Sequence, residues 1–463
     1  MTNSIDRRKM LQRAGGGFGI LPLAGMFQQQ CKAEGSSQGP HFPAKAKRVI
    51  FLFMNGAPSH VDTFDPKPKL TEYEGQLPEG MKTRGNGYMP SPFRFAPHGE
   101  SGVIMSELFP QLATCADDLC VIRSMHTDTP NHEPGLLLMH SGSQQPTRPC
   151  LGSWASYGLG TENENLPAFV ALCPGMPVVG PQLWSAAFLP GNHQAMSVNT
   201  SDMKLDSLVA HLKHPSLSRS EQREQLDLIQ HLNRLQLQSS SDDELNAHIR
   251  SMELAYQMQS EASEAFDVSN EPQSVHDRYG NSTFAQSCLL GRRLLERGVR
   301  FVQVYYVDKN KQPWDTHTDN DNKHRTLCAD SDKATAALLM DLKERGMLED
   351  TLVIWGGEFG RTPYSQINND KNKAKPGRDH HATGFSMFLA GGGVRGGMMY
   401  GQTDELGMHA IEDRVHVHDL HATILHLMGI EHTRLTYRYS GRDFRLTDVH
   451  GRVVSDIIQT NTT

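Results

Sequence analysis

The sequence lacks a dominant charge: its 463 residues carry 45 Lys and Arg against 52 Asp and Glu, a formal net charge of −7. Proteins that bind DNA or RNA normally carry a basic patch or a high isoelectric point, so nucleic acid is not an expected partner. The sequence also lacks an apolar run of the about 20 residues that cross a bilayer, so we expect no transmembrane span.

Cysteine is sparse and unpatterned. The seven cysteines include no C-x-x-C pair, which argues against a zinc knuckle, and their scattered, odd-numbered placement argues against a disulfide scaffold. We expect mostly buried thiols and at most one or two disulfides, for which Cys115 and Cys120 are the nearest pair.

Histidine, in contrast, is plentiful, at 23 residues. Neutral imidazole is the commonest side-chain ligand for metals in proteins, so this surplus is a first indication of a metal site. The apolar share of 37% is typical of a globular chain with a buried core.

Residues 1–35 have the features of an export signal. Arg7 and Arg8 precede a mildly apolar stretch, FGILPLAGMF, at residues 18–27. This arrangement resembles the twin-arginine signal, which exports proteins that are already folded, so we expect the protein in the periplasm or cell envelope. A lipid anchor on Cys31 is a weaker interpretation, because three glutamines precede that cysteine.

Short apolar runs predict the strands of a central sheet. The first, Lys47–Met54, is apolar on both faces, as in a parallel strand that helices cover on two sides. Helical patterns separate the runs, which is the βαβ order of an α/β fold with a mainly parallel sheet and helices on both faces. The other predicted strands are Leu119–Ile122, Ala168–Leu172, Val299–Tyr306, Thr351–Trp355 and Phe385–Ala390, and the predicted helices are Leu108–Cys115, Phe284–Arg297, Asp332–Gly346 and His416–Met428.

One segment interrupts this order. Residues 215–263 are polar, rich in Gln, Glu, Ser and Leu, and contain no Gly. They predict a helical insertion of two helices joined near Ser239–Ser241, lying on the surface or over the mouth of a site.

Carboxylates and imidazoles occur where the predicted strands end. Ligands bind outside the carboxyl ends of parallel strands, and these side chains are the ligands of zinc, manganese, magnesium or calcium. We therefore predict a divalent metal site, although Asp62 and Asp65 are also typical of a capped turn. The candidates are His60, Asp62, Asp65, His132, Asp315, His317, Glu358, Asp379, His380 and His381.

Long motifs then carry a family resemblance: NGAPSHVDTFDPKP at 55–68, YGNSTFAQSCLLGRRLLERGVRFVQV at 279–304, TLVIWGGEFGRTP at 351–363, GRDHH at 377–381, AGGGVRGGMMYGQTDE at 390–405 and the closing run at 417–451. The chain resembles the DUF1501 family of exported proteins, common in planctomycetes, which are similar to the sulfatase and alkaline phosphatase superfamily. The resemblance implies one alkaline phosphatase-like α/β domain over residues 45–463. It also implies a hydrolase of phosphate or sulfate esters that uses two metal ions.

The resemblance implies roles for several of the candidates. Asp315 and His317 match the ligands of one metal ion, and Glu358 stands where an Asp-His pair usually supplies the other. His380 or His381 matches the final ligand.

The sequence departs from the superfamily pattern in two places. Asn55 occupies the position of the first ligand Asp, unless Asp62 supplies that ligand. Asn131 or His132 occupies the nucleophile position, where Ser, Thr or formylglycine is usual, and no Cys-x-Pro-x-Arg sequence is present.

The activity that these residues favour is metal-assisted hydrolysis of a small-molecule or polysaccharide ester. In that mechanism His132 acts as general base or nucleophile, and Arg361 or Arg378 holds an anionic oxygen. Thr127, Thr129 and Ser59 are reserve nucleophiles. Two alternatives stay open: a catalytically inactive module that binds an anionic polysaccharide or an envelope protein, and a glycosidase with a carboxylate pair.

Overall fold

The computed structural model describes residues 39–79, 87–209, 216–237, 243–308, 311–366 and 374–460. The expected export signal at residues 1–35, including Cys31, lies outside this part of the chain. Among the described residues, no helix combines the length and the apolar character needed to cross a membrane.

A nine-stranded sheet organises the described part of the chain. Its strands are β1 (Arg48–Met54), β4 (Leu119–His126), β5 (Phe169–Leu172), β6 (Met196–Val198), β7 (Phe301–Tyr306), β8 (Thr351–Gly356), β11 (Phe385–Ala390), β12 (Met398–Tyr400) and β15 (Val415–His416). The order is β12-β4-β11-β8-β1-β7-β5-β6, with β15 also paired to β4. All pairs are parallel except those of β11 with β4 and β8, so the expected α/β fold with a mainly parallel sheet is confirmed.

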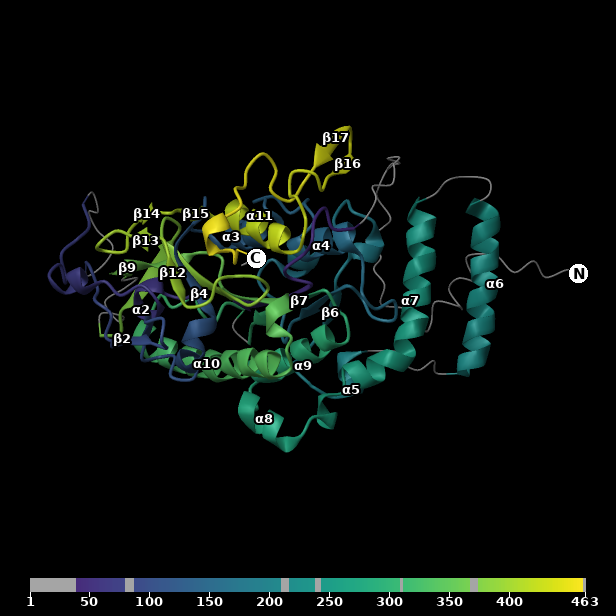
Figure 1. Ribbon diagram of the computed structural model, residues 1–463, viewed down its shortest axis with the longest axis horizontal. Helices are drawn as coiled ribbons and strands as arrows, with labels where there is room; N and C mark the ends of the chain where they lie inside the picture. The colour runs from purple at the N-terminus through teal and green to yellow at the C-terminus, as the bar shows by residue number, and fades with distance from the viewer. Residues whose placement is uncertain are drawn as a thin grey trace, which may run out of the picture.

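Helices cover both faces of the sheet (Figure 1). One face carries α9 (Thr283–Glu296) and α10 (Asn320–Glu344), and the other carries α3 (His132–Ser141), α4 (Leu151–Leu159) and α11 (Val417–Leu427). Alternate side chains of β1 enter the two cores: Ile50 and Leu52 pack into the first, and Phe51 and Phe53 into the second. This explains why the strand is apolar at every position from Val49 to Met54.

The predicted elements overlap the observed ones, with two differences. Residues 108–115 do not form an α-helix, because the segment is a 3-10 helix, η4 (Leu112–Asp118). The segments that carry Arg361 and the GRDHH motif are strands rather than loops, β9 (Gly360–Gln366) and β10 (Gly377–His381), paired antiparallel outside the main sheet. Their polar sequences lack the apolar pattern that marks core strands, because the hairpin is not sandwiched between two helix layers.

The predicted helical insertion forms α6 (Arg219–Leu237) and α7 (Asp243–Ala265). The two helices stand side by side at one end of the long axis, with α6 outermost, and β9 lies toward the opposite end (Figure 1). The insertion therefore does not cover the region around β9.

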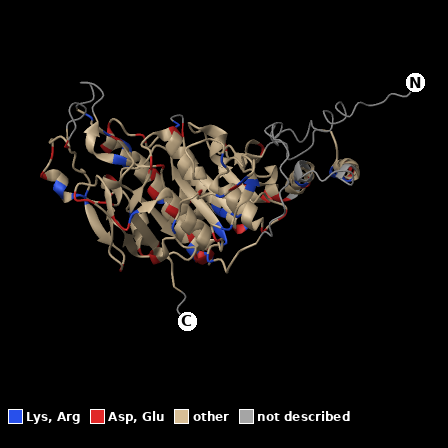
Figure 2. Ribbon diagram, turned by 90° about the horizontal axis from the view of Figure 1, so that it is seen from above, with Lys and Arg blue, Asp and Glu red and all other residues tan. Residues whose placement is uncertain are grey.

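Smaller elements complete the described chain. Basic and acidic residues are interspersed along it (Figure 2), as the near-balanced charge count predicts. These elements are α2 (His60–Thr63), η3 (Pro68–Thr71), β2 (Phe95–His98), β3 (Val103–Ser106), η5 (Gly180–Trp184), η6 (Gly191–His193), α5 (Leu205–Leu208), η7 (Val268–Asn270), α8 (Gln273–Tyr279), η8 (Leu348–Asp350), β13 (Gln402–Thr403), β14 (Ala410–Glu412), β16 (Tyr437–Tyr439), β17 (Arg442–Phe444) and η10 (Ser455–Ile457).

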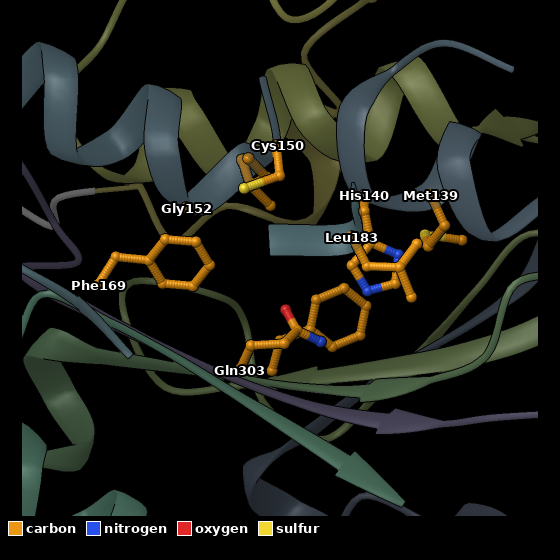
Figure 3. Close-up of a pocket in the computed structure, with 9 residues that line it drawn as sticks. Met139, His140, Cys150, Gly152, Phe169, Leu183 and Gln303 are labelled. Carbon is orange, nitrogen blue, oxygen red and sulfur yellow. The ribbon is translucent and has the colours of Figure 1, made fainter. Parts of the chain in front are cut away.

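A small cavity of about 10 Å³ lies between β7 and the helices α3 and α4 (Figure 3). Gln303 and His140 line it, and among the described residues Nε2 of each side chain has no hydrogen-bond partner. The volume suits a single water at most. Cys150 also lines the cavity, and like the other cysteines of the described chain it is a free, buried thiol, so the Cys115–Cys120 bridge is not formed.

Candidate metal centre

Four side chains from three parts of the chain converge on one point: His132, Asp315, His317 and His380. Each offers a ligand atom, and these atoms all lie within 4.8 Å of one another. Asp315 is at the centre, because its Oδ1 lies 3.3 Å from His132 Nε2, 2.9 Å from His317 Nε2 and 3.3 Å from His380 Nε2. We call this set the histidine–aspartate group.

The start of α3 supplies His132, and Glu358 orients its ring. His132 Nδ1 lies 2.6 Å from Glu358 Oε1, and since a carboxylate only accepts, the Nδ1 hydrogen is donated to it. Nε2 is buried and makes no hydrogen bond among the described residues, although it faces Asp315. A carboxylate behind a histidine is the arrangement that holds imidazole ligands toward metals.

Glu358 is itself fixed by the loop after β1. The side chain is fully buried, and Gly56 N donates to its two oxygens at 3.2 and 3.4 Å. Phe359 packs its ring against His132 and His380, at centroid distances of 4.8 and 5.0 Å. The two imidazoles are thereby held in place from behind.

The hairpin of β9 and β10 supplies His380. A bulge between Arg378 and His380 changes the register of this hairpin at Asp379. Bulges re-aim side chains near sites, and here Arg378 contacts Asp62 while His380 contacts Asp315. His317 lies 2.9 Å from His380 through their Nε2 atoms.

Two glycines allow these segments to approach. A Cβ on Gly377 would lie 2.0 Å from the carbonyl carbon of His317, and a Cβ on Gly56 would lie 2.4 Å from Asp315 N. Gly56 also has a φ of +104°, which side chains rarely allow. Any other residue at either position would push a ligand-bearing loop away.

The electrostatics of the group favour a cation. Burial raises the pKa of Asp315, but its contacts with the three histidines and Arg361 outweigh burial, so that its pKa lies far below the usual range. Burial lowers the pKa of His132, yet the Asp315 and Glu358 carboxylates raise it by more. Carboxylates that attract a proton to His132 attract a metal cation for the same reason.

The residues present fit a bound divalent ion. Imidazole nitrogens and carboxylate oxygens are zinc ligands, and binding through three of these four would leave the fourth position of a tetrahedral ion open for water. The observed separations of 2.9 and 3.3 Å agree with the about 3.3 Å expected between donors around a tetrahedral ion with bonds of about 2.0 Å. The Nε2 atom of His132 also supports a bound ion. It makes no hydrogen bond among the described residues, and a buried ring nitrogen without a partner is costly.

Comparison with known families places the chain. The family model described as "Protein of unknown function (DUF1501)" matches residues 46–458. The chain belongs to the DUF1501 family. The expected resemblance is thus confirmed over nearly the whole chain. A search of curated proteins finds no match to it.

Solved structures similar to this DUF1501 chain include an alkaline phosphatase, a sulfatase and a lipoteichoic acid synthase. An alkaline phosphatase from the Antarctic bacterium TAB5 is 11% identical, with 84% of this chain and 99% of that chain covered and a TM-score of 0.35. A sulfatase from Pseudoalteromonas sp. is 13% identical, with 83% and 68% covered and a TM-score of 0.34. A lipoteichoic acid synthase from Listeria monocytogenes is 10% identical, with 84% and 74% covered and a TM-score of 0.32. At such low identities and TM-scores, these structures assign no role to any residue of the histidine–aspartate group.

Asp62 and Arg378 of the DUF1501 chain lie outside the histidine–aspartate group and pair with each other. Arg378 Nε and Nη2 donate to the Asp62 carboxylate at 2.7 and 3.1 Å, and Asn320 donates to it at 2.9 Å. Both members of the pair are fully buried. The Asp62 carboxylate is therefore occupied by a guanidinium.

Arg361 is also occupied by protein groups. Its guanidinium contacts Asp315 Oδ1 at 2.6 Å, Ala57 O at 3.1 Å and Gly56 O, and the side chain is fully buried. Arg361 thus balances the charge of Asp315 and ties the loop after β1 to the site, instead of presenting a free fork to an anion.

His60 and His381 form a second, separate pair. Their rings stack at 5.8 Å, and their Nε2 atoms donate to the carbonyls of Gly407 and Met408 at 2.9 and 2.7 Å. Burial lowers the pKa of His60 to about 4 and of His381 to about 3. These imidazoles are neutral and pack beneath the segment at 407–408.

The remaining candidates differ in their contacts. Asp379 Oδ1 is 3.8 Å from His317 Nδ1 and accepts from His380 N. Asn131 is the exposed N-cap residue of α3, without a side-chain cap, and Asn55 is fully buried with no partner for its amide among the described residues. Asp65 accepts from Thr403 and lies 2.9 Å from Lys67. Of the reserve hydroxyls, Thr129 accepts from Asn131 N, while those of Thr127 and Ser59 are buried and unbonded within the described chain.

The sequence analysis missed two residues that hold the imidazoles, Phe359 and Gln366. Gln366 Oε1 is hydrogen-bonded to His317 Nδ1. Phe359 directly follows Glu358 and could have been noticed as an aromatic side chain at a strand end. Gln366 has no signal of its own, because the pairing of β9 with β10 brings it to His317.

Proposed function

We propose that this protein is a metal-dependent hydrolase of phosphate or sulfate esters. The observation that carries the proposal is the convergence of His132, Asp315, His317 and His380 within 4.8 Å. A bound divalent ion would supply a water of lowered pKa and would stabilise negative charge on the group being transferred.

Zinc, of the ions considered, is the one that the group favours. Magnesium, calcium and manganese prefer sets made of oxygen ligands, whereas three of the four donors here are imidazoles. We propose one ion in this group; a second ion would need ligands from outside it, for which Asn55 is the candidate with an unbonded buried amide.

An anionic substrate is supported by the position of α3. The helix begins at His132, so its positive end lies at the histidine–aspartate group. The exposed side chain of Asn131 does not cap the helix and is free to contact a substrate oxygen. We assign His132 to metal binding, with Glu358 as the residue that positions it, and we assign Arg361 to charge balance.

We further propose that the protein acts after export, in the periplasm or cell envelope. The supporting feature is the Arg7-Arg8 pair ahead of the apolar residues 18–27. Replacing both arginines by lysine should retain the protein in the cytoplasmic fraction; unchanged export would contradict this part of the proposal.

A metal-holding binding module for anionic polysaccharide is the second candidate. It is favoured by Asn131 or His132 at the position where a Ser, Thr or formylglycine nucleophile is usual, and by Asn55 in place of an aspartate. It predicts a bound ion without turnover, so one experiment separates the two candidates.

The test combines elemental analysis with an ester screen. The wild-type protein should contain about one zinc ion per chain and should hydrolyse at least one aryl phosphate, phosphodiester or sulfate ester. His380→Gln should lose both properties, while the matched change His409→Gln, on an exposed histidine, should keep both. A bound ion without hydrolysis would favour the binding module, and an ion-free wild type would rule out both candidates.

A further inference from the structure

A buried chain of hydrogen bonds begins inside the metal centre, at the residue that separates Asp315 from His317. This residue is Thr316, whose Oγ1 donates to Asn320 Oδ1 at 2.8 Å. Asn320 Nδ2 in turn donates to Asp62 Oδ2 at 2.9 Å. Thr316, Asn320 and Asp62 are all fully buried. The loop that carries two of the four candidate ligands is therefore tied to the Asp62 carboxylate.

Arg378 ties strand β10 to the same carboxylate. Its Nε and Nη2 donate to Asp62 at 2.7 and 3.1 Å, and its backbone N donates to Thr316 O at 3.1 Å. His380 follows Arg378 by two residues in β10. The Asp62 carboxylate thus joins the strand that carries His380 to the loop at 315–317.

Buried charges hold this arrangement in place. Asp62, in α2, and Arg378 are both fully buried, and the guanidinium of Arg378 also donates to Thr362 O at 3.1 Å and to Met89 O at 3.0 Å. A buried charge that loses its partner is strongly destabilising. The ion pair therefore favours a single arrangement of β10 against the loop at 315–317.

We propose that Asp62 is a positioning residue of the metal centre, which sets the separation between His380 and the loop at 315–317. The proposal rests on the proposed metal-dependent function, because it concerns how the ligands meet an ion. Asp62 acts through Arg378 and Asn320 and does not itself bind the ion. Ligands that the protein already holds in place need no further ordering when an ion binds, so affinity is higher.

Zinc affinity and the spectrum of the cobalt-loaded protein test the proposal. Thr316→Val keeps the shape of the side chain but cannot donate to Asn320, so zinc affinity in chelator competition should fall about 10-fold or more. Thr316→Ser keeps the hydroxyl and should retain near wild-type affinity. The visible absorption of bound Co²⁺ depends on the geometry of its ligands, so it should change in Thr316→Val and stay the same in Thr316→Ser.

Thr423→Val is the matched control. Thr423 of α11 is also fully buried, and its Oγ1 donates to Asp419 O at 2.7 Å and accepts from Val454 N at 2.9 Å, outside the histidine–aspartate group. This change should lower stability toward urea and leave zinc affinity and the cobalt spectrum unchanged. The comparison separates positioning of the ligands from general destabilisation.

Asp62→Asn tests the centre of the network and should lower zinc affinity most, because it removes the charge that holds Arg378. If this variant does not fold, Asn320→Ala serves instead, since it breaks the link to Thr316 and keeps the ion pair. Asn320→Ala should lower zinc affinity as much as Thr316→Val, and the two changes together should lower it no further, because both break one link.

The two proposals fail in different ways. A wild type that binds zinc, with unchanged affinity and cobalt spectrum in both Thr316→Val and Asn320→Ala, would overturn the positioning role and leave the proposed function standing. A wild type that binds no ion would overturn both.

Discussion

The described chain holds two groups of histidines that differ in what their ring nitrogens face. In the histidine–aspartate group, His132, His317 and His380 point Nε2 at one carboxylate oxygen and stay partly exposed. Between α3 and α11, His140 and His421 are buried and bond to the carbonyls of Leu136 and Met139.

The difference lies in the charge of the partner. A carbonyl accepts one N–H but brings no negative charge that would hold a second proton on the ring. Burial therefore lowers the pKa of His140 to about 4 and of His421 to about 3, and both imidazoles are neutral. A shared carboxylate gathers the rings around a negative charge and favours a cation between them. The two groups therefore show that a histidine count indicates a metal only where the rings converge on a carboxylate.

The sharpest way to break this comparison is to remove the shared charge. Asp315→Asn takes the anionic oxygen from all three imidazoles, so metal affinity should fall by more than the about 10–100-fold typical of a change behind a ligand. Competition with a chelator measures the affinity. Asp128→Asn is the matched control, because Asp128 pairs with His416, at 3.1 Å, outside the histidine–aspartate group, and metal affinity should be unchanged. Equal effects of the two changes would remove the distinction between the two groups.

A smaller effect is expected one step behind the ligand. Glu358→Gln keeps the shape that positions His132 but loses the negative charge that makes Nε2 of His132 a stronger metal ligand. Metal affinity should therefore drop about 10–100-fold. Chelator competition again provides the measurement, with Glu133→Gln, an exposed residue in the first turn of α3, as the control. A loss as large as that of Asp315→Asn would instead make Glu358 a direct ligand.

Much of the fold follows from the sequence, because a strand such as β1 must be apolar along its buried length, from Val49 to Met54, to be covered on both faces. The site follows in part. His132, Asp315, His317 and His380 all lie near strand ends in the sequence, but nothing in the sequence separates them from His60 and His381. That separation depends on the β10 bulge at Asp379, which places the neighbours His380 and His381 with different partners.

The sequence also did not predict which carboxylates Arg361 and Arg378 contact. Arg361 and Arg378 both lie in motifs near the site, yet one balances Asp315 and the other Asp62. Which carboxylate meets which guanidinium is decided by the pairing of β9 with β10 and by contacts with the segment after β1. Arg361 reaches Ala57 O, 304 residues away, and Arg378 reaches Asp62, 316 residues away. Local patterns do not encode such distant pairings.

The smallest expected effect is on stability and concerns His421, one of the buried histidines that bond to carbonyls. The pKa of His421 is about 3 in the folded protein, mainly because of burial, against about 6.5 in an unfolded chain. Between these values the unfolded chain binds one more proton at this residue, so the free energy of unfolding falls as the pH is lowered below about 6.5. From pH 7 to 5.5 the loss should be about 1 kcal/mol for this histidine.

His421→Gln, whose amide can still donate to Met139 O, should remove that part of the pH dependence, as measured by urea unfolding at the two pH values. His409→Gln, at an exposed histidine, is the matched control. An unchanged pH dependence in His421→Gln would mean that the buried imidazole accepts a proton without loss, and the contrast between carbonyl-bound and carboxylate-bound histidines would then fail.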